Sequence, residues 1–308
     1  MLEILRAGIQ TTVQDQGRTG FRHLGVAQAG ALDAPAMWLA NRLVNNVGTA
    51  AGLEVVAGPV EIRFLRDAWF ALCGANFDAT LDDQALFCGW RYRVKKGQKL
   101  RLFGPKSGMR TYLAVDGGIE VPVVMGSRST DVRAGFGGHA GRPICNGDRL
   151  PLGETYALKN KLGTPQRQWT PEVRVLRGPE FEQFDEHSQQ NFFKHAWTVS
   201  AQSNRMGYRL QGAALQRNDK TELLSHGVMP GVVQVPPNGQ PIVLLADSQT
   251  TGGYPRIAVV IAADLWKLAQ AQPGRQFCFV ETSQEGAKAA RLQWQHELYR
   301  FEWSLYGK

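Results

Sequence analysis

Apolar residues along the chain come in short runs that are separated by polar turns rich in glycine. A glycine stands three residues before an apolar residue at Gly97, Gly147 and Gly274, as it would where a turn leads into a strand. Runs of strand length and strand-forming residue type lie at Val60–Phe64, Trp69–Leu72, Lys99–Phe103, Thr111–Val115, Val173–Leu176 and Phe277–Glu281. The pattern predicts a mainly β protein with a few helices, of the barrel or sandwich type.

Four segments show a helical pattern instead. Asp33–Val44 places an aspartate at the N-cap position and Pro35 in the first turn, with apolar residues on one face. Further helices are expected at Pro179–Phe193, at Ala263–Gln270 and, as an amphipathic terminal element, at Gln284–Arg300.

A polar, basic segment with little periodicity lies between Leu152 and Thr170 and marks the expected domain boundary. The length suits two domains of moderate size. We therefore expect an N-terminal β-domain over 1–160, a C-terminal β-domain over 171–283 and a terminal helical segment over 284–308.

The formal net charge of +8 raises the question of a nucleic-acid partner. The basic residues are scattered, however, and the densest group, at 95–101, alternates with Val94, Leu100 and Leu102 as in a half-exposed strand. We expect a solvated face and no nucleic-acid binding. Attraction to anionic small molecules or to an acidic partner protein stays open.

Cysteine usage and hydropathy narrow the protein class further. Cys73, Cys88, Cys145 and Cys278 are far apart, with no CxxC pair and no neighbouring histidine ligands, so neither a metal site nor a disulfide framework is expected. No apolar run is long enough for a membrane span, and the N-terminus has no signal-peptide pattern. These features predict a cytoplasmic protein without a membrane partner.

The segment 229–265 is the most informative part of the sequence. Two apolar runs, Gly231–Val235 and Ile242–Ala246, are joined by a turn-forming Pro-Pro-Asn-Gly-Gln-Pro and predict a hairpin. A polar, glycine-containing loop, Asp247–Arg256, follows, and the chain then becomes apolar again at Ile257–Ala263. Such a loop between buried segments is how a rigid scaffold presents a functional site, although an ordinary surface loop has the same composition.

Three further polar clusters contain residue types suited to binding and proton transfer. They lie at Thr11–Phe21, Gly126–Asp131 and Ser203–Leu210. Arginine can clamp a carboxylate or phosphate, and aspartate can orient a water, although each cluster alone also fits turn chemistry. His226 has no partner at ligand spacing and is interpreted as a hydrogen-bonded structural histidine. The sequence has no GxxxxGK[ST], GxSxG or HExxH motif.

Taken together and in this order, the motifs resemble the allophanate hydrolase subunit 2 family. The motifs are TTVQDQGRTGF, GALD, GSRSTD, RGPE, SNRMGYRL and PGVVQVPPNGQPIVLLADSQTTGGYPRI. The resemblance covers residues 1 to about 283 and implies a fold of two cyclophilin-like β-barrels, in agreement with the strand-rich pattern.

The resemblance implies one of three roles. Members of the family serve as the C subunit of an ATP-dependent 5-oxoprolinase, as the carboxyltransferase part of urea carboxylase, or as an antikinase that binds a kinase inhibitor. This sequence contains neither a biotin carboxylase nor a biotin-attachment segment, and its start and its Asp67–Leu72 strand resemble the first group. We expect conversion of 5-oxo-L-proline to L-glutamate, with ATP bound by or shared with a partner. The implied partners are a cyclophilin-like, kinase-inhibitor-like B subunit and a barrel-type A subunit.

Location in the family motifs, combined with residue type, gives an expected site. Arg205 or Arg128 would hold a carboxylate or phosphate, and Asp247 or Asp131 would orient a water. Gln249, Thr250 and the main-chain amides of Gly252 and Gly253 would bind the amide oxygen. The residues expected to bind substrate also include Asn204, Thr250, Thr251, Gly252, Gly253 and Tyr254.

Overall fold

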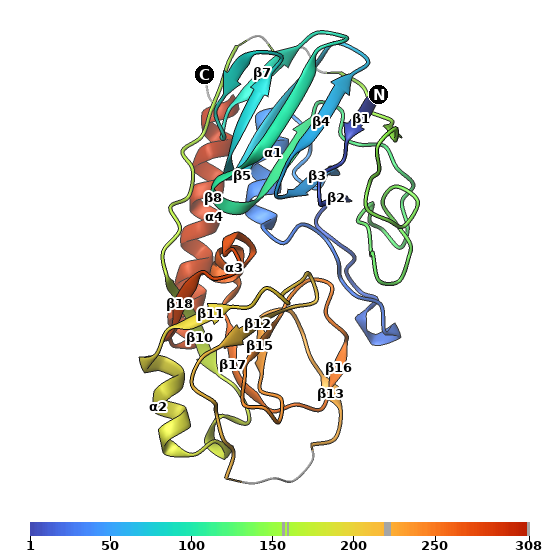
Figure 1. Cartoon of the computed structure of the whole chain (residues 1–308). Coiled ribbons are helices and arrows are strands. Elements are labelled where there is room, and N and C mark those ends of the chain that lie inside the picture. The colour runs from blue at the N-terminus through green and yellow to red at the C-terminus, as the bar shows by residue number, and fades with distance from the viewer. Residues whose placement is uncertain (156–157, 159, 219–222, 307–308) are drawn as a thin grey trace. The chain divides into compact units, whose positions relative to one another are not determined.

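The computed structural model describes residues 1–155, 158, 160–218 and 223–306 (Figure 1). The chain divides into two compact units. Unit 1 comprises residues 1–19, 29–168 and those from 300 onward, and unit 2 comprises residues 20–28 and 169–299. The main break, between residues 168 and 169, falls in the polar segment that the sequence pattern marks as a boundary.

Unit 1 is built on a nine-stranded sheet. The strands are β1 (Leu2–Arg6), β2 (Gln10–Gln14), β3 (Gly52–Val56), β4 (Val60–Phe64), β5 (Ala68–Leu81), β6 (Gln84–Leu86), β7 (Arg91–Val94), β8 (Lys99–Val115) and β9 (Arg149–Leu150). Their order is β2-β3-β8-β4-β1-β9, and β5 pairs with β6, β7 and β8. The pairings are antiparallel, and the two long strands, β5 and β8, pair over most of their length.

The core of unit 1 follows from alternation along these strands. In β4 the residues alternate between buried and half-buried, so that one face enters the core, where Phe64 lies 5.4 Å from Phe70 between ring centroids. Helix α1 (Ala34–Leu43) buries Met37 and begins where predicted. Its start is fixed by Asp33, whose carboxylate accepts a hydrogen bond from Ala36 N at 3.0 Å.

Unit 2 contains a closed seven-stranded barrel in the order β10-β17-β14-β15-β12-β11-β18. These strands are β10 (Glu172–Arg177), β11 (Trp197–Val199), β12 (Gly207–Gln211), β14 (Val232–Gln234), β15 (Ile242–Leu244), β17 (Arg256–Val260) and β18 (Gln276–Glu281). Strands β10 and β18 pair in parallel and close the barrel. The predicted hairpin is confirmed, because Val233 of β14 pairs with Val243 of β15.

A separate two-stranded ladder joins β13 (His226–Gly227) to β16 (Thr251–Gly252). Short 3-10 turns complete unit 2 at η1 (Arg22–Leu24), η2 (Phe181–Gln183) and η3 (Ala262–Asp264). The helices are α2 (Glu186–Lys194), α3 (Leu265–Gln270) and α4 (Gln284–Tyr306), whose last residues count to unit 1. Helix α2 packs on β18, where the rings of Phe192 and Phe279 stack at 4.6 Å.

The predicted elements differ from the structure in three places. Lys99–Phe103 and Thr111–Val115, predicted as two strands, are parts of the single strand β8, and the terminal helix, predicted to end at Arg300, continues to Tyr306. The predicted helix over 179–193 is wrong in its first half, because α2 begins only after Asp185, whose carboxylate accepts from Ser188 N at 2.6 Å. The mainly β fold class is confirmed. Among the described residues, no helix has the length and hydropathy to cross a membrane. The described residues also contain no cluster of three or more His, Cys, Asp or Glu side chains that could hold a metal ion.

Candidate functional site

The polar segment 247–256, which we call the site loop, connects β15 to β17 and has a fixed backbone. Its short strand β16 pairs with β13, and next to this ladder the Val228 N–H donates to the Thr250 carbonyl at 3.0 Å. The buried Gln234 donates through its side-chain amide to the Tyr254 carbonyl at 3.3 Å. The loop is therefore held at several points by its main chain.

Several side chains of the site loop are, by contrast, available to form hydrogen bonds. Within the described parts of the chain, the side chains of Gln249, Thr250 and Thr251 make no hydrogen bond. Tyr254 exposes 46% of its surface. A fixed backbone that presents unpaired amide and hydroxyl groups is suited to recognising a small polar ligand, because little ordering is needed on binding.

The two glycines of the site loop are explained by close packing. A Cβ atom on Gly252 would lie 2.8 Å from the Gln234 side-chain nitrogen. A Cβ atom on Gly253 would lie 3.0 Å from the Leu223 carbonyl oxygen. Both positions therefore favour glycine because neighbouring groups approach the main chain closely.

Two predicted catalytic residues, Arg205 and Asp247, are each other's partners. Arg205 Nε donates to Asp247 Oδ2 at 2.8 Å and Nη2 donates to Oδ1 at 2.9 Å. Their side chains are only 4% and 6% exposed. A buried, bidentate ion pair of this kind holds the start of the site loop against residues 203–206. The structure thus brings the two residues together, as an anchor for the loop.

The remaining predicted residues lie outside the named helices and strands. Asn204 accepts from Met206 N at 2.8 Å and shapes the turn that carries Arg205. Arg128 and Asp131 belong to unit 1. There Arg128 Nη2 donates to Glu120 at 2.5 Å, and the Asp131 carboxylate accepts from Ala134 N at 3.0 Å.

A second ion pair, absent from the sequence prediction, holds the other end of the site loop. Glu180 accepts from Arg256 N at 2.9 Å, from Arg256 Nε at 2.8 Å and from Arg256 Nη2 at 2.6 Å. Burial works to raise the pKa of Glu180, but the hydrogen bonds and charge of Arg256 outweigh it, so that the pKa lies below its ordinary value. Both residues stand in family motifs, RGPE and GGYPRI, which was the available signal.

Arg22 is the other residue that the sequence prediction missed. It lies in the 20–28 segment of unit 2, directly after the TTVQDQGRTGF motif. Its Nη2 donates to the Val228 carbonyl at 2.7 Å and to the Gln249 carbonyl at 3.1 Å. Burial lowers the pKa of the Arg22 guanidinium. Arg22 therefore connects the site loop to the residue that follows β13.

His226 lies in β13 and is paired in the ladder with Gly252. Its Nδ1 lies 3.1 Å from the Leu224 carbonyl, so in the neutral ring Nδ1 carries the proton and Nε2 is an acceptor. Its positive form contributes to the lowered pKa of Glu180. The structural interpretation of His226 accounts for Nδ1 but leaves Nε2 without a partner among the described residues.

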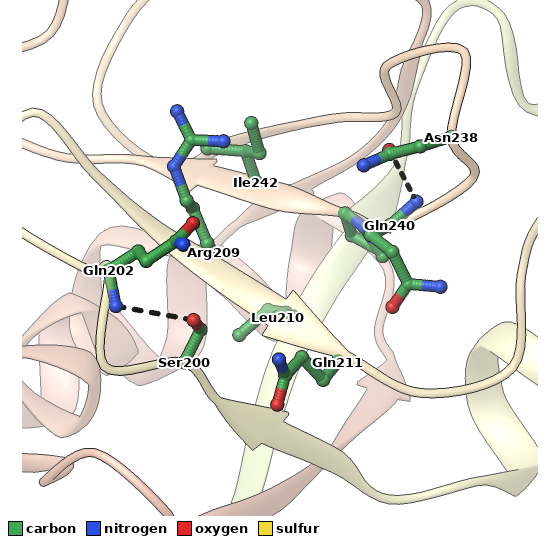
Figure 2. A pocket seen from close by; sticks show the side chains of 9 residues that line it. Ser200, Gln202, Arg209, Leu210, Gln211, Asn238, Gln240 and Ile242 are labelled. Carbon is green, nitrogen blue, oxygen red and sulfur yellow. Dashed lines mark hydrogen bonds between the residues drawn. The ribbon is translucent and has the colours of Figure 1, made fainter.

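A small depression elsewhere on unit 2 is a weaker candidate. It has a volume of about 120 Å³ and is lined by Ser200, Gln202, Arg209, Leu210, Gln211, Asn238, Gln240, Pro241 and Ile242 (Figure 2). Two of its polar side chains are used in local turns: Gln202 N donates to Ser200 Oγ and Gln240 N donates to Asn238 Oδ1. The volume is below the roughly 300 Å³ at which typical ligand pockets begin. We therefore place the candidate site at the site loop.

Comparisons with a family model and with individual proteins agree on the family of this chain. Residues 24–281 match the carboxyltransferase domain family, subdomain A and B. The chain is 52% identical over 309 residues to the 5-oxoprolinase C subunit of Escherichia coli, covering 100% of both chains. It is 40% identical to the 5-oxoprolinase C subunit of Haemophilus influenzae, covering 97% of this chain and 96% of that one.

A solved structure supports the same grouping. The chain superimposes on the urea amidolyase of K. lactis with a TM-score of 0.90 and 29% identity, over 97% of this chain and 20% of that one. The site loop and both of its ion pairs lie inside the matched family region. This chain belongs to the carboxyltransferase domain family, subdomain A and B.

Proposed function

We propose that the chain is the C subunit of an ATP-dependent 5-oxoprolinase, which converts 5-oxo-L-proline to L-glutamate. The observation that carries the proposal is similarity over full length to two proteins named as the C subunit of 5-oxoprolinase, at 52% and 40% identity. The chain also matches the urea amidolyase of Saccharomyces cerevisiae, but at 31% identity and over only 17% of that protein.

The reaction sets requirements that the site loop can meet. A five-membered lactam is a stable amide, so its oxygen must be polarised while the ring and its carboxylate are held. The unpaired side chains of Gln249, Thr250 and Thr251 supply donors for that oxygen. We assign Arg205 and Asp247 the role of holding the loop.

Coupling to ATP is proposed from the same relationship. ATP would transfer its terminal phosphoryl group to the amide oxygen, and water would then add to the carbon. Cleavage of the C–N bond would release the amine and leave an acyl phosphate, whose hydrolysis gives glutamate and phosphate. The chain has no GxxxxGK[ST] phosphate loop, so we place the nucleotide site on a partner protein or at its interface. Arg128 and Asp131, which residue type favours for phosphate and water, lie in unit 1 and would act only if a site forms around them in the complex.

The proposed enzyme is a complex, because each of the two relatives is named as one subunit of an enzyme. We propose a cyclophilin-like B subunit and a barrel-type A subunit as partners. Activity of the chain alone is not expected, because one loop with amide donors supplies neither a nucleotide site nor an activated water.

A second candidate function is carboxyl transfer to a urea-like amide. It is favoured by the similarity to urea amidolyases in sequence and in structure. The same loop donors would then bind the amide oxygen of the acceptor. A purely regulatory, antikinase-type role would use the loop to bind a partner protein.

One reconstitution separates these functions. The chain is mixed with its two neighbouring gene products, and phosphate and glutamate are measured with and without 5-oxoproline, omitting each protein in turn. We expect phosphate release that needs all three proteins and that forms glutamate in equal amount. A stable complex that shows no stimulation by 5-oxoproline would overturn the proposal, and a biotinylated partner would then favour carboxyl transfer.

A further inference from the structure

Three buried side-chain atoms near the site loop have no hydrogen-bond partner among the described residues. They are Arg22 Nη1, His226 Nε2 and Ser248 Oγ. Ser248 is fully buried and directly precedes Gln249. Buried polar atoms are almost always paired in folded proteins, so a group of unpaired ones needs an explanation.

These atoms lie on segments that one guanidinium joins. Nη2 of Arg22 donates to the Val228 and Gln249 carbonyls, at 2.7 and 3.1 Å. Ser248 is next to the second of these acceptors, and His226 is two residues before the first. The residues that carry the unpaired atoms are therefore Arg22 itself and two close sequence neighbours of the residues whose carbonyls it binds.

The charge of Arg22 distinguishes it from other arginines of unit 2. Three of these arginines form a bidentate ion pair with a carboxylate: Arg205 with Asp247, Arg256 with Glu180, and Arg174 with Asp264. Within the described residues, Arg22 has only carbonyl acceptors. A guanidinium stays protonated, and a partly buried positive charge without a counterion is costly. An incoming anion would offset that cost.

We propose that Arg22 Nη1 and Ser248 Oγ form a subsite for an oxyanion of the ligand, beside Gln249. This inference rests on the proposed function, in which the oxyanion is the substrate carboxylate or a phosphoryl group of ATP. Both groups accept parallel hydrogen bonds from arginine. His226 is left out, because Nε2 in its neutral form is an acceptor and would repel an anion. Binding here would place the rest of the ligand against the unpaired side chains of Gln249 and Thr250.

The test compares Arg22→Gln and Ser248→Ala with wild type in the reconstituted complex. The Michaelis constants for 5-oxoproline and for ATP are measured separately. A carboxylate subsite predicts that Arg22→Gln raises KM for 5-oxoproline by about 10- to 100-fold while KM for ATP changes less than about twofold. A phosphoryl subsite predicts the reverse. Arg93→Gln, an exposed arginine on β7, is the matched control and should change neither constant.

A ligand without the carboxylate distinguishes a loss of carboxylate binding by Arg22 from a loss of its support for the site loop. Wild type should discriminate strongly between 5-oxoproline and 5-oxoprolinamide, and a carboxylate-binding Arg22 predicts that Arg22→Gln loses this discrimination. If Arg22→Gln fails to fold, Ser248→Ala serves instead, with a smaller rise in the same KM. If neither variant shifts either KM by more than twofold, the subsite is overturned.

Failure of the proposed function has a different signature. The wild-type complex would then show no turnover of 5-oxoproline, and the subsite is judged by calorimetry on the isolated chain with 5-oxoproline and with inorganic phosphate. Saturable binding of either anion that is lost in Arg22→Gln supports the subsite. Absence of saturable binding of both anions to wild type overturns it.

Discussion

Arg205 and Asp247 show that a contact distant in sequence can give residues a role that residue type alone does not reveal. Both are charged residues in family motifs, and each has a side chain suited to binding or catalysis. Their role depends on a contact between residues 42 positions apart, in which each satisfies the other inside the unit. Once paired and buried, their charges stabilise each other and the start of the site loop.

Replacing Asp247 by Asn should therefore affect stability first. The change leaves the Arg205 charge buried without its counterion, and we expect a loss of about 3–5 kcal/mol in the free energy of unfolding of unit 2. Urea unfolding followed by fluorescence measures it. The control is Asp78→Asn, which breaks an ion pair whose side chains are 62% and 58% exposed and should cost less than about 1 kcal/mol. Equal effects of the two changes would contradict the anchoring role.

Asp148 provides a residue-scale test in unit 1. Hydrogen bonds from Arg142 lower the pKa of Asp148 to about 2, against an ordinary value near 3.9. Because the folded form holds its proton less tightly, this stabilisation is present above about pH 4 and is lost as the pH falls toward 2. Asp148→Asn should flatten the dependence of the unfolding midpoint on pH in that window. An unchanged slope between about pH 4 and 2 would show that the pair does not stabilise the fold.

Part of the candidate site could be predicted from residues. The site loop stands out because it is polar, contains glycine and lies between two apolar runs, and its position is local information. Arg22, by contrast, acts through carbonyls that lie 206 and 227 positions away. A main-chain acceptor leaves no trace in residue type, so sequence reasoning had no means of finding this contact.

At the scale of elements, local signals predicted what local interactions decide. The β14–β15 hairpin formed as expected because its turn and both apolar runs agree. The start of α2 was missed because Pro179 suits a first helical turn by residue type, whereas Asp185 caps the helix further along the chain. Between them the chain makes the 3-10 turn η2, and Glu180, directly before this turn, pairs with Arg256.

The cap at Asp185 gives a prediction for α2. Asp185→Ala removes the acceptor for Ser188 N and should lower the free energy of unfolding by about 1 kcal/mol. Asp185→Ser keeps a capping oxygen and should recover most of the loss. Thermal unfolding of the three proteins under identical conditions tests this. If serine is no better than alanine, the helix start is set by tertiary packing, such as that of Phe192, and not by the cap.

For the whole molecule, the mainly β class was predictable because strand length and turn spacing are repeated along the chain. The assignment of residues 20–28 to unit 2, while their neighbours on both sides belong to unit 1, was not. That assignment is decided by packing between segments far apart in sequence, for which one sequence carries no signal. It also brings Arg22 to the site loop.

The most direct test of the account is Gln249→Ala in the reconstituted complex. Gln249 has a fixed main chain and, among the described residues, an unpaired side chain, so the substitution should leave assembly and thermal stability unchanged. If this side chain polarises the lactam oxygen, the kcat for glutamate formation should fall by about 100-fold or more. A rate within twofold of wild type, in a complex that assembles normally, would contradict the placement of the catalytic site at the site loop.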